Sequence, residues 1–147
     1  MSAAQTSADA GPAGTGPAGP TLADGIAHPT VFVNDVERAR AFYENLGLRV
    51  AVRASTGIFM TAGKGTLFAL VHRPGATPPA HTVAGFEVQD LGSVVRALRA
   101  RGVTFEEYDS PGLRTVDGIA DMGSYRAAWL RDPDGNFIGV HEPPRPE

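Results

Sequence analysis

The feature that most constrains the fold is an internal repeat with an offset of 55 residues. The segment VFVND at 31–35 corresponds to FEVQD at 86–90. Each segment is a short β-prone run that ends in an aspartate, a residue that often caps a helix N-terminus. Apolar residues then recur at helical spacing, and Gly47 and Gly102 each follow the capping aspartate by 12 residues, as expected for a helix stop. The chain is therefore predicted to contain two equivalent strand–helix units.

Strand-like segments follow each predicted helix. They are residues 48–53, 58–62 and 66–72 in the first half, and 103–108, 125–131 and 137–142 in the second. The predicted fold class is thus α+β, with two tandem βαβββ modules that form a curved, cup-shaped sheet. Each sheet would bury one face against its helix and leave the other face to line a cavity. The glycine-containing segment 109–123 is longer than a turn requires, and we expect it to be a lid.

A tight turn is predicted at Asp132–Phe137, which reads DPDGNF. Pro133 presets φ, and Gly135 accepts the positive φ that closes a hairpin. The side chains of Asp132 and Asp134 can accept hydrogen bonds from nearby backbone N–H groups. The motif therefore joins the last two strands of the second module.

The amino-acid composition indicates where the folded domain begins and ends, and which kinds of binding partner are not expected. Residues 1–24 are rich in Ala, Gly and Pro and are predicted to be a disordered tail, and residues 143–147 a Pro-rich end. The folded domain would span 25–142, with modules at about 26–72 and 82–142. A net charge of −3 gives no reason to expect nucleic acid or an anionic membrane as a partner. With no signal sequence or membrane span recognisable, we expect a cytoplasmic protein.

Three segments together resemble a known superfamily. They are VFVNDVERARAFYENLGLRV, GFEVQDLGSVVRALRARGV and AAWLRDPDGNFIGVHE, in that order along the chain. This pattern is similar to the vicinal oxygen chelate superfamily, which includes glyoxalases, bleomycin-resistance proteins and extradiol dioxygenases. The resemblance implies paired βαβββ modules, often a homodimer, and cup-shaped sites. It does not select an activity, because this fold is used by metalloenzymes and by metal-free binding proteins.

The resemblance allows the metal ligands of the family to be checked one at a time. The family uses four positions, usually His or Gln, Glu, His and Glu. His28 matches the first position, but the other three fall at Val83 or Ala84, at Gly139, and within 65–71, which contains no carboxylate. One ligand of four is too few for a catalytic ion, and the chain has no cysteine. We therefore predict that no metal cofactor is bound; a displaced divalent ion, if there is one, would use His28 and His141.

The predicted function is metal-independent binding of a small organic molecule, which the protein would sequester or carry. The alternatives are a divalent-metal-dependent lyase, isomerase or dioxygenase of the same superfamily, and a metal-free isomerase or cyclase. Aromatic and polar side chains on the predicted strands are the candidate ligand contacts, although residues of the size of Trp129 and the phenylalanines more often belong to the core. The candidates are His28, Phe32, Asn34, Phe86, Tyr108, Tyr125, Arg126, Trp129 and His141.

Overall fold

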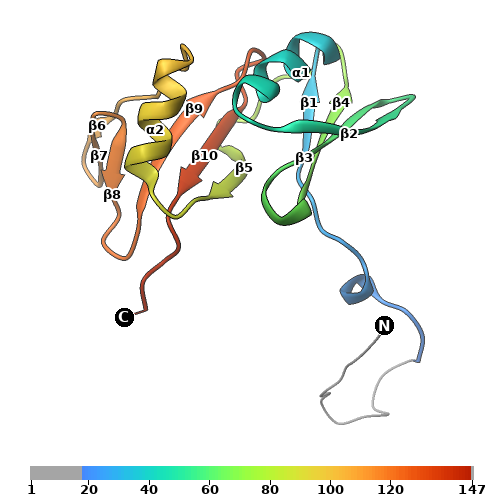
Figure 1. Cartoon of the computed structure of the whole chain (residues 1–147), viewed down its shortest axis with the longest axis horizontal. Coiled ribbons are helices and arrows are strands. Elements are labelled where there is room, and N and C mark those ends of the chain that lie inside the picture. The colour runs from blue at the N-terminus through green and yellow to red at the C-terminus, as the bar shows by residue number, and fades with distance from the viewer. Residues whose placement is uncertain (1–17, 147) are drawn as a thin grey trace.

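The computed structural model describes residues 18–146 and contains two modules that lie side by side (Figure 1). The first module is a four-stranded sheet with one helix. Its strands have the order β1-β4-β3-β2; β1 and β4 are parallel and the other pairs are antiparallel. The elements are β1 (Thr30–Val33), α1 (Val36–Asn45), β2 (Arg49–Ala54), β3 (Gly57–Thr61) and β4 (Leu67–His72).

The second module repeats this arrangement and adds strands to it. Its six-stranded sheet has the order β5-β10-β9-β8-β7-β6, again with one parallel pair, β5 and β10. The elements are β5 (Thr82–Glu87), α2 (Leu91–Ala100), β6 (Asp109–Ser110), β7 (Leu113–Val116), β8 (Ile119–Asp121), β9 (Arg126–Arg131) and β10 (Phe137–His141). The expected α+β class with two βαβββ modules is confirmed.

Both helices begin and end where the repeat predicts. The side chain of Asp35 accepts a hydrogen bond from the Arg38 backbone N–H at 3.0 Å, and Asp90 accepts one from Ser93 at 3.1 Å. The backbone φ is +108° at Gly47 and +88° at Gly102, which a glycine adopts without strain. The two halves therefore use the same local signals to delimit their helices.

The segment between α2 and β9 differs from the prediction. The expected strand at 103–108 is reduced to a single bridge between Phe105 and Leu130, with the Glu106 N–H donating to the Trp129 carbonyl at 2.8 Å. The segment 109–123, expected to be a lid, instead forms β6, β7 and β8, which extend the sheet beyond β9. β8 pairs with β9 only at Arg126 and Ala127, and Phe105 meets the same edge of β9 farther along, at Leu130.

One hydrophobic core connects the modules. It contains buried residues of both, including Tyr43 from α1 and Leu130 from β9. Across the junction, the rings of Phe68 and Phe86 stack with their centroids 5.5 Å apart. The edge strands β1 and β5 approach each other where the sheets meet, but belong to separate sheets. Because the modules share a core, we expect them to unfold together.

The ends of the chain lie outside this core. A 3-10 turn at Leu22–Asp24 precedes β1 on an arm that leads away from the body of the molecule (Figure 1). The predicted disordered tail, 1–24, falls for the most part outside the described residues. Residues 142–146 form neither helix nor strand. Among residues 18–146, neither helix has the length and apolar character needed to cross a bilayer.

Candidate functional site

The uncovered face of the second sheet carries a tryptophan and a histidine on neighbouring strands. Trp129 on β9 is paired with Gly139 on β10, and His141 lies two residues beyond Gly139. Because side chains alternate along a strand, Trp129 and His141 are on the same face. The intervening residues, such as Leu130 and Val140, are buried in the core on the α2 side. Trp129 and His141 therefore lie on the face opposite the helix.

Two glycines lie next to these rings. A methyl group at Gly139 would lie 3.6 Å from the indole Nε1 of Trp129 and 3.3 Å from Thr82 Cγ2. A methyl group at Gly85 would lie 4.0 Å from Nε2 of His141. A methyl group at Gly139 would be crowded by Thr82, and a longer side chain there would also meet the indole, so glycine lets Trp129 lie close against the sheet. At Gly85 a methyl group would only reach van der Waals contact with the imidazole.

Two tyrosines complete the group. The ring of Tyr108 meets Trp129 edge to face at a centroid distance of 5.8 Å, and Tyr125 meets His141 at 5.9 Å. Such edge-to-face contacts are favourable for aromatic pairs. We call Tyr108, Tyr125, Trp129 and His141 the aromatic face. The structure therefore brings together four of the nine candidates predicted from the sequence.

The aromatic face also offers polar groups. Nδ1 of His141 lies 2.9 Å from the Glu142 carbonyl oxygen, an acceptor, so Nδ1 carries the hydrogen and Nε2 of the neutral ring is left as an acceptor. Desolvation and the nearby Glu106 raise the pKa of Tyr108, so its hydroxyl remains protonated and can donate. The face can thus stack against a flat molecule and also exchange hydrogen bonds with it.

Two further candidates lie on the corresponding face of the first sheet. His28, just before β1, meets the ring of Phe59 edge to face at 5.2 Å. Phe32 is 41% exposed and has the Arg73 guanidinium 4.5 Å from its ring centroid. Phe59 is paired with Val52, which is 57% exposed. The uncovered face of the first sheet is therefore apolar too.

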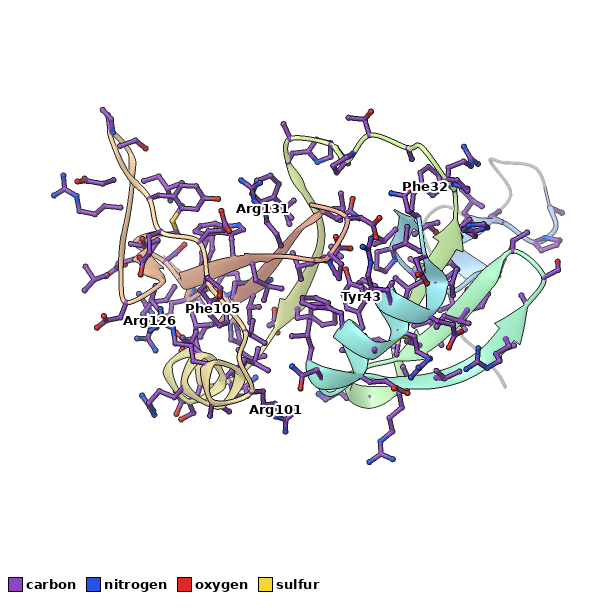
Figure 2. The ribbon with its side chains drawn as sticks, turned by 90° about the horizontal axis from the view of Figure 1, so that it is seen from above. Phe32, Tyr43, Arg101, Phe105, Arg126 and Arg131 are labelled. Carbon is purple, nitrogen blue, oxygen red and sulfur yellow. The ribbon has the colours of Figure 1, made fainter. Side chains whose placement is uncertain are left out.

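The remaining three candidates have structural contacts. Asn34 donates from its backbone and side chain to Asp134. Phe86 faces the core against Phe68, on the opposite side of its sheet from His141. Arg126 donates two hydrogen bonds to Glu142, and Figure 2 shows it on the α2 side, far from Phe32 in the other module.

The contact between Arg126 and Glu142 fixes the start of α2. The carboxylate of Glu142 also accepts a hydrogen bond from the Leu91 N–H at 2.9 Å, in the first turn of the helix. The Arg126 hydrogen bonds, followed by the Leu91 N–H, lower the pKa of Glu142 to about 2. Glu142 is therefore ionised at neutral pH and links β9, β10 and α2.

The side chains present do not fit the four-ligand metal site of the family. Gly139 provides no ligand, and Trp129 and Thr82 occupy the space above it. Ala84 is buried on the core side of β5. His28 and His141 belong to different modules and contact different aromatic rings, Phe59 and Tyr125. Within residues 18–146, no three His, Cys, Asp or Glu side chains come close enough to hold an ion.

A groove of about 870 Å³ lies between α2 and the strands β6, β7 and β8. Four arginines line it, but three of them are already paired with carboxylates. Arg126 pairs with Glu142 at 2.7 Å, Arg114 with Asp109 at 3.0 Å and Arg99 with Glu107 at 3.7 Å. These pairs neutralise most of the positive charge, so the groove is a weaker candidate for a binding site than the aromatic face.

Sequence reasoning left two glycines and one phenylalanine out of the candidate residues. Gly85, Gly139 and Phe59 were not among the candidates, yet they shape the two uncovered faces. A glycine inside a predicted strand is a usable signal, since it often marks a place where another group approaches the backbone closely.

Comparison with known proteins identifies the family. The model of the Glyoxalase/Bleomycin resistance protein/Dioxygenase superfamily matches residues 25–140. The chain therefore belongs to this superfamily. No curated protein sequence matches it.

Solved structures with low sequence identity share the fold. A bleomycin-binding protein in complex with bleomycin has a TM-score of 0.63 at 22% identity, over 80% of this chain and 97% of that one. A glyoxalase/bleomycin resistance protein from Catenulispora acidiphila has a TM-score of 0.56 at 26% identity, over 81% and 98%. The fosfomycin resistance protein FosX from Listeria monocytogenes has a TM-score of 0.59 at 18% identity, over 81% and 93%.

Proposed function

We propose that the protein binds a flat organic molecule on the aromatic face and sequesters or carries it without a metal ion. The observation that carries this proposal is the stacking surface made by Trp129 and His141 over Gly139 and Gly85. Small-molecule sites are lined mainly by apolar and aromatic side chains with a few polar groups. The four residues of the aromatic face, all only partly buried, match that composition. The bleomycin complex of a protein with the same fold supports a binding role.

The absence of a fitting ligand set favours binding without a metal. A divalent ion in a protein site generally needs about three protein ligands. The residues at the family's ligand positions include a glycine and core-facing Ala84, as described above. The alternative roles, a metal-dependent enzyme and a metal-free isomerase or cyclase, both require turnover, so the same experiments can separate them from simple binding.

Trp129 makes the proposal directly testable, because it is the only tryptophan in the chain. A panel of planar aromatic compounds would be titrated against the protein while the tryptophan fluorescence is recorded. We expect at least one saturable change in emission. The variant Gly139→Val retains Trp129 but displaces it from the sheet, and should weaken that binding at least tenfold. Ser93→Ala, at an exposed residue of α2, serves as the control.

Three outcomes would contradict the proposal. One is a panel in which no compound gives a saturable signal. Another is equal affinity in the parent protein and Gly139→Val. The third is consumption of the bound compound: if turnover stops with a chelator, a metalloenzyme is indicated, and if it continues with a chelator, a metal-free enzyme is indicated.

We also propose that the protein acts as a homodimer. Both uncovered sheet faces are apolar, with Val52 57% and Phe32 41% exposed on the first. A second copy could place its first sheet over the aromatic face and convert that face into an enclosed cup, which would desolvate a bound ligand. Light scattering after size exclusion would test this directly: a mass of about 31 kDa, twice the 15.4 kDa of one chain, is expected, and a mass of 15.4 kDa would refute it.

A further inference from the structure

A small cavity of about 150 Å³ lies where the two modules meet, and no residue of the aromatic face lines it. The linker between the modules forms one wall, and β1 and the turn between β9 and β10 form the others. Its lining includes Thr30, Ala76, Thr77, Pro78, Val83 and Asp134. We call it the junction cavity. Most of its lining is apolar, and Asp134 is its only charged residue.

Asp134 has one oxygen that is satisfied and one that is not. Oδ1 accepts hydrogen bonds from the Asn34 backbone N–H at 3.0 Å and side-chain amide at 2.7 Å, and Arg38 lies 3.4 Å away. The side chain is only 4% exposed. Oδ2 is the one buried side-chain oxygen or nitrogen without a partner in the described part of the chain, residues 18–146.

A buried carboxylate oxygen without a hydrogen-bond donor is energetically costly, since it has lost its water and gained no replacement. Native structures rarely leave such an atom without a hydrogen-bond donor. Asp134 lines a cavity, and the cavity is large enough for a few non-hydrogen atoms but smaller than the roughly 300 Å³ of a typical drug-sized site. The missing partner should therefore be a compact donor that occupies the junction cavity.

The lining decides the chemical class of that donor. A calcium-like ion takes six to eight oxygen ligands, often from several carboxylates. The junction cavity offers one carboxylate, and residues 18–146 contain no cluster of three His, Cys, Asp or Glu side chains. A protonated primary amine has three N–H donors and needs only one carboxylate with neutral acceptors beside it. Thr30 and Thr77, which line the cavity, carry hydroxyls of this kind.

We propose that the junction cavity binds a short primary alkylammonium group. The ammonium donates to Oδ2 of Asp134, and its aliphatic part lies against Val83 and Pro78. The site holds the linker and both modules around one ligand, so its occupancy stabilises the junction. It does not depend on the aromatic face, and its ligand is recognised by charge rather than by stacking.

The test is isothermal calorimetry on the full chain with ethylammonium chloride as the probe. Sodium, potassium and tetramethylammonium chlorides at the same ionic strength are the comparisons, because tetramethylammonium carries the charge but no N–H donor. We expect saturable binding of ethylammonium only. Asp134→Asn retains an oxygen acceptor for Asn34 but removes the charge, and should weaken binding at least tenfold. Asp121→Asn, an exposed carboxylate elsewhere, should leave it unchanged.

A second variant tests the proposal independently, in case Asp134→Asn does not fold. Ala76→Leu fills the junction cavity from the linker and leaves Asp134 intact, so it should also abolish binding while the protein remains folded by circular dichroism. Saturable binding of sodium or potassium instead would overturn the amine class. An absence of any saturable binding would mean that an ordered water satisfies Oδ2, and binding that survives both variants would place the ligand elsewhere; either result overturns the proposal.

Discussion

Tyr43 and Asp132 join the two modules through a buried hydrogen bond. The hydroxyl of Tyr43, on α1 of the first module, donates to Oδ2 of Asp132, after β9 of the second, at 2.8 Å. Both residues are buried, Tyr43 with no exposed surface and Asp132 with 5%. Burial and the neighbouring carboxylate raise the pKa of Tyr43, so the hydroxyl stays protonated and always donates. Figure 2 shows Tyr43 on the side of α1 that faces the second module.

Removing this hydroxyl should destabilise the whole protein. In Tyr43→Phe the ring still fills the core, but Asp132 loses a donor to its buried carboxylate. We expect the free energy of unfolding to fall by about 1–3 kcal/mol. Urea denaturation followed by circular dichroism measures the change. Tyr125→Phe removes a hydroxyl from a half-buried tyrosine of the aromatic face and should change stability by less than about 0.5 kcal/mol. Equal effects of the two variants would argue against the role of the hydrogen bond.

Gly57, at the start of β3, is a position where only glycine fits. A Cβ there would lie 1.9 Å from the Leu70 carbonyl oxygen on the paired strand β4, which is backbone and cannot turn away. Gly57→Ala should therefore displace the β3–β4 pairing and cost more than about 3 kcal/mol, in the range of severe substitutions. Thermal unfolding would report the loss. Gly63→Ala is the control, because no atom lies within 4 Å of its added Cβ and its φ is not positive. Similar melting temperatures for the two variants would contradict the prediction that only glycine fits at position 57.

The two capping aspartates should contribute equally. Asp35→Ala and Asp90→Ala each remove the side-chain acceptor for one backbone N–H in the first turn of a helix. Each should lower the free energy of unfolding by about 1 kcal/mol. Chemical denaturation of both variants, with Gln89→Ala beside Asp90 as the control, measures the effect. Strongly unequal losses would show that the two halves, despite their repeat, do not depend on their caps to the same extent.

Glu142 should make stability depend on pH in the acidic range. Its pKa is about 2 in the folded protein, below the ordinary 4.5, so the folded state favours the carboxylate. Its contribution is present in full above about pH 4.5 and is lost as the pH falls toward 2. Glu142→Gln should therefore lower the melting temperature at pH 7, and the difference from the parent protein should shrink on acidification. Asp109→Asn breaks an exposed pair with Arg114 and should change little at either pH. A Glu142→Gln difference that is constant from pH 7 to pH 2.5 would contradict the assignment.

In the turn between β9 and β10, the backbone conformation could be predicted from the sequence, but one of the hydrogen-bond partners could not. Gly135 has the predicted positive φ, +88°, and Asp132 accepts hydrogen bonds from the Asp134 and Asn136 N–H groups within the turn. Asp134, also predicted to bond locally, instead accepts from Asn34, 100 residues earlier in the chain. The local sequence identified both carboxylates as acceptors but could not show that one of them bonds across the modules.

Local signals in the amino-acid sequence are enough to predict both helices, most strands and their repetition. Helix caps, stop glycines and the alternation of apolar residues act over a few residues, so they can be recognised without knowledge of the fold. The family resemblance added the pairing of the modules. These signals were sufficient for α1, α2 and most of the strands, and for the candidates Tyr108, Tyr125, Trp129 and His141.

Which face of its sheet a side chain lies on, and which residues it contacts there, follow only from the tertiary structure. Phe86 and Trp129 are both aromatic residues on predicted strands, yet one stacks on Phe68 in the core and the other lies over Gly139 on the uncovered face. Segment 103–108 has a strand-like sequence, but it meets β9 only through the bridge between Phe105 and Leu130, while β8 pairs with Arg126 and Ala127 of the same edge. Strand pairing and burial depend on contacts between residues far apart in the chain, because each edge and each face can be occupied only once.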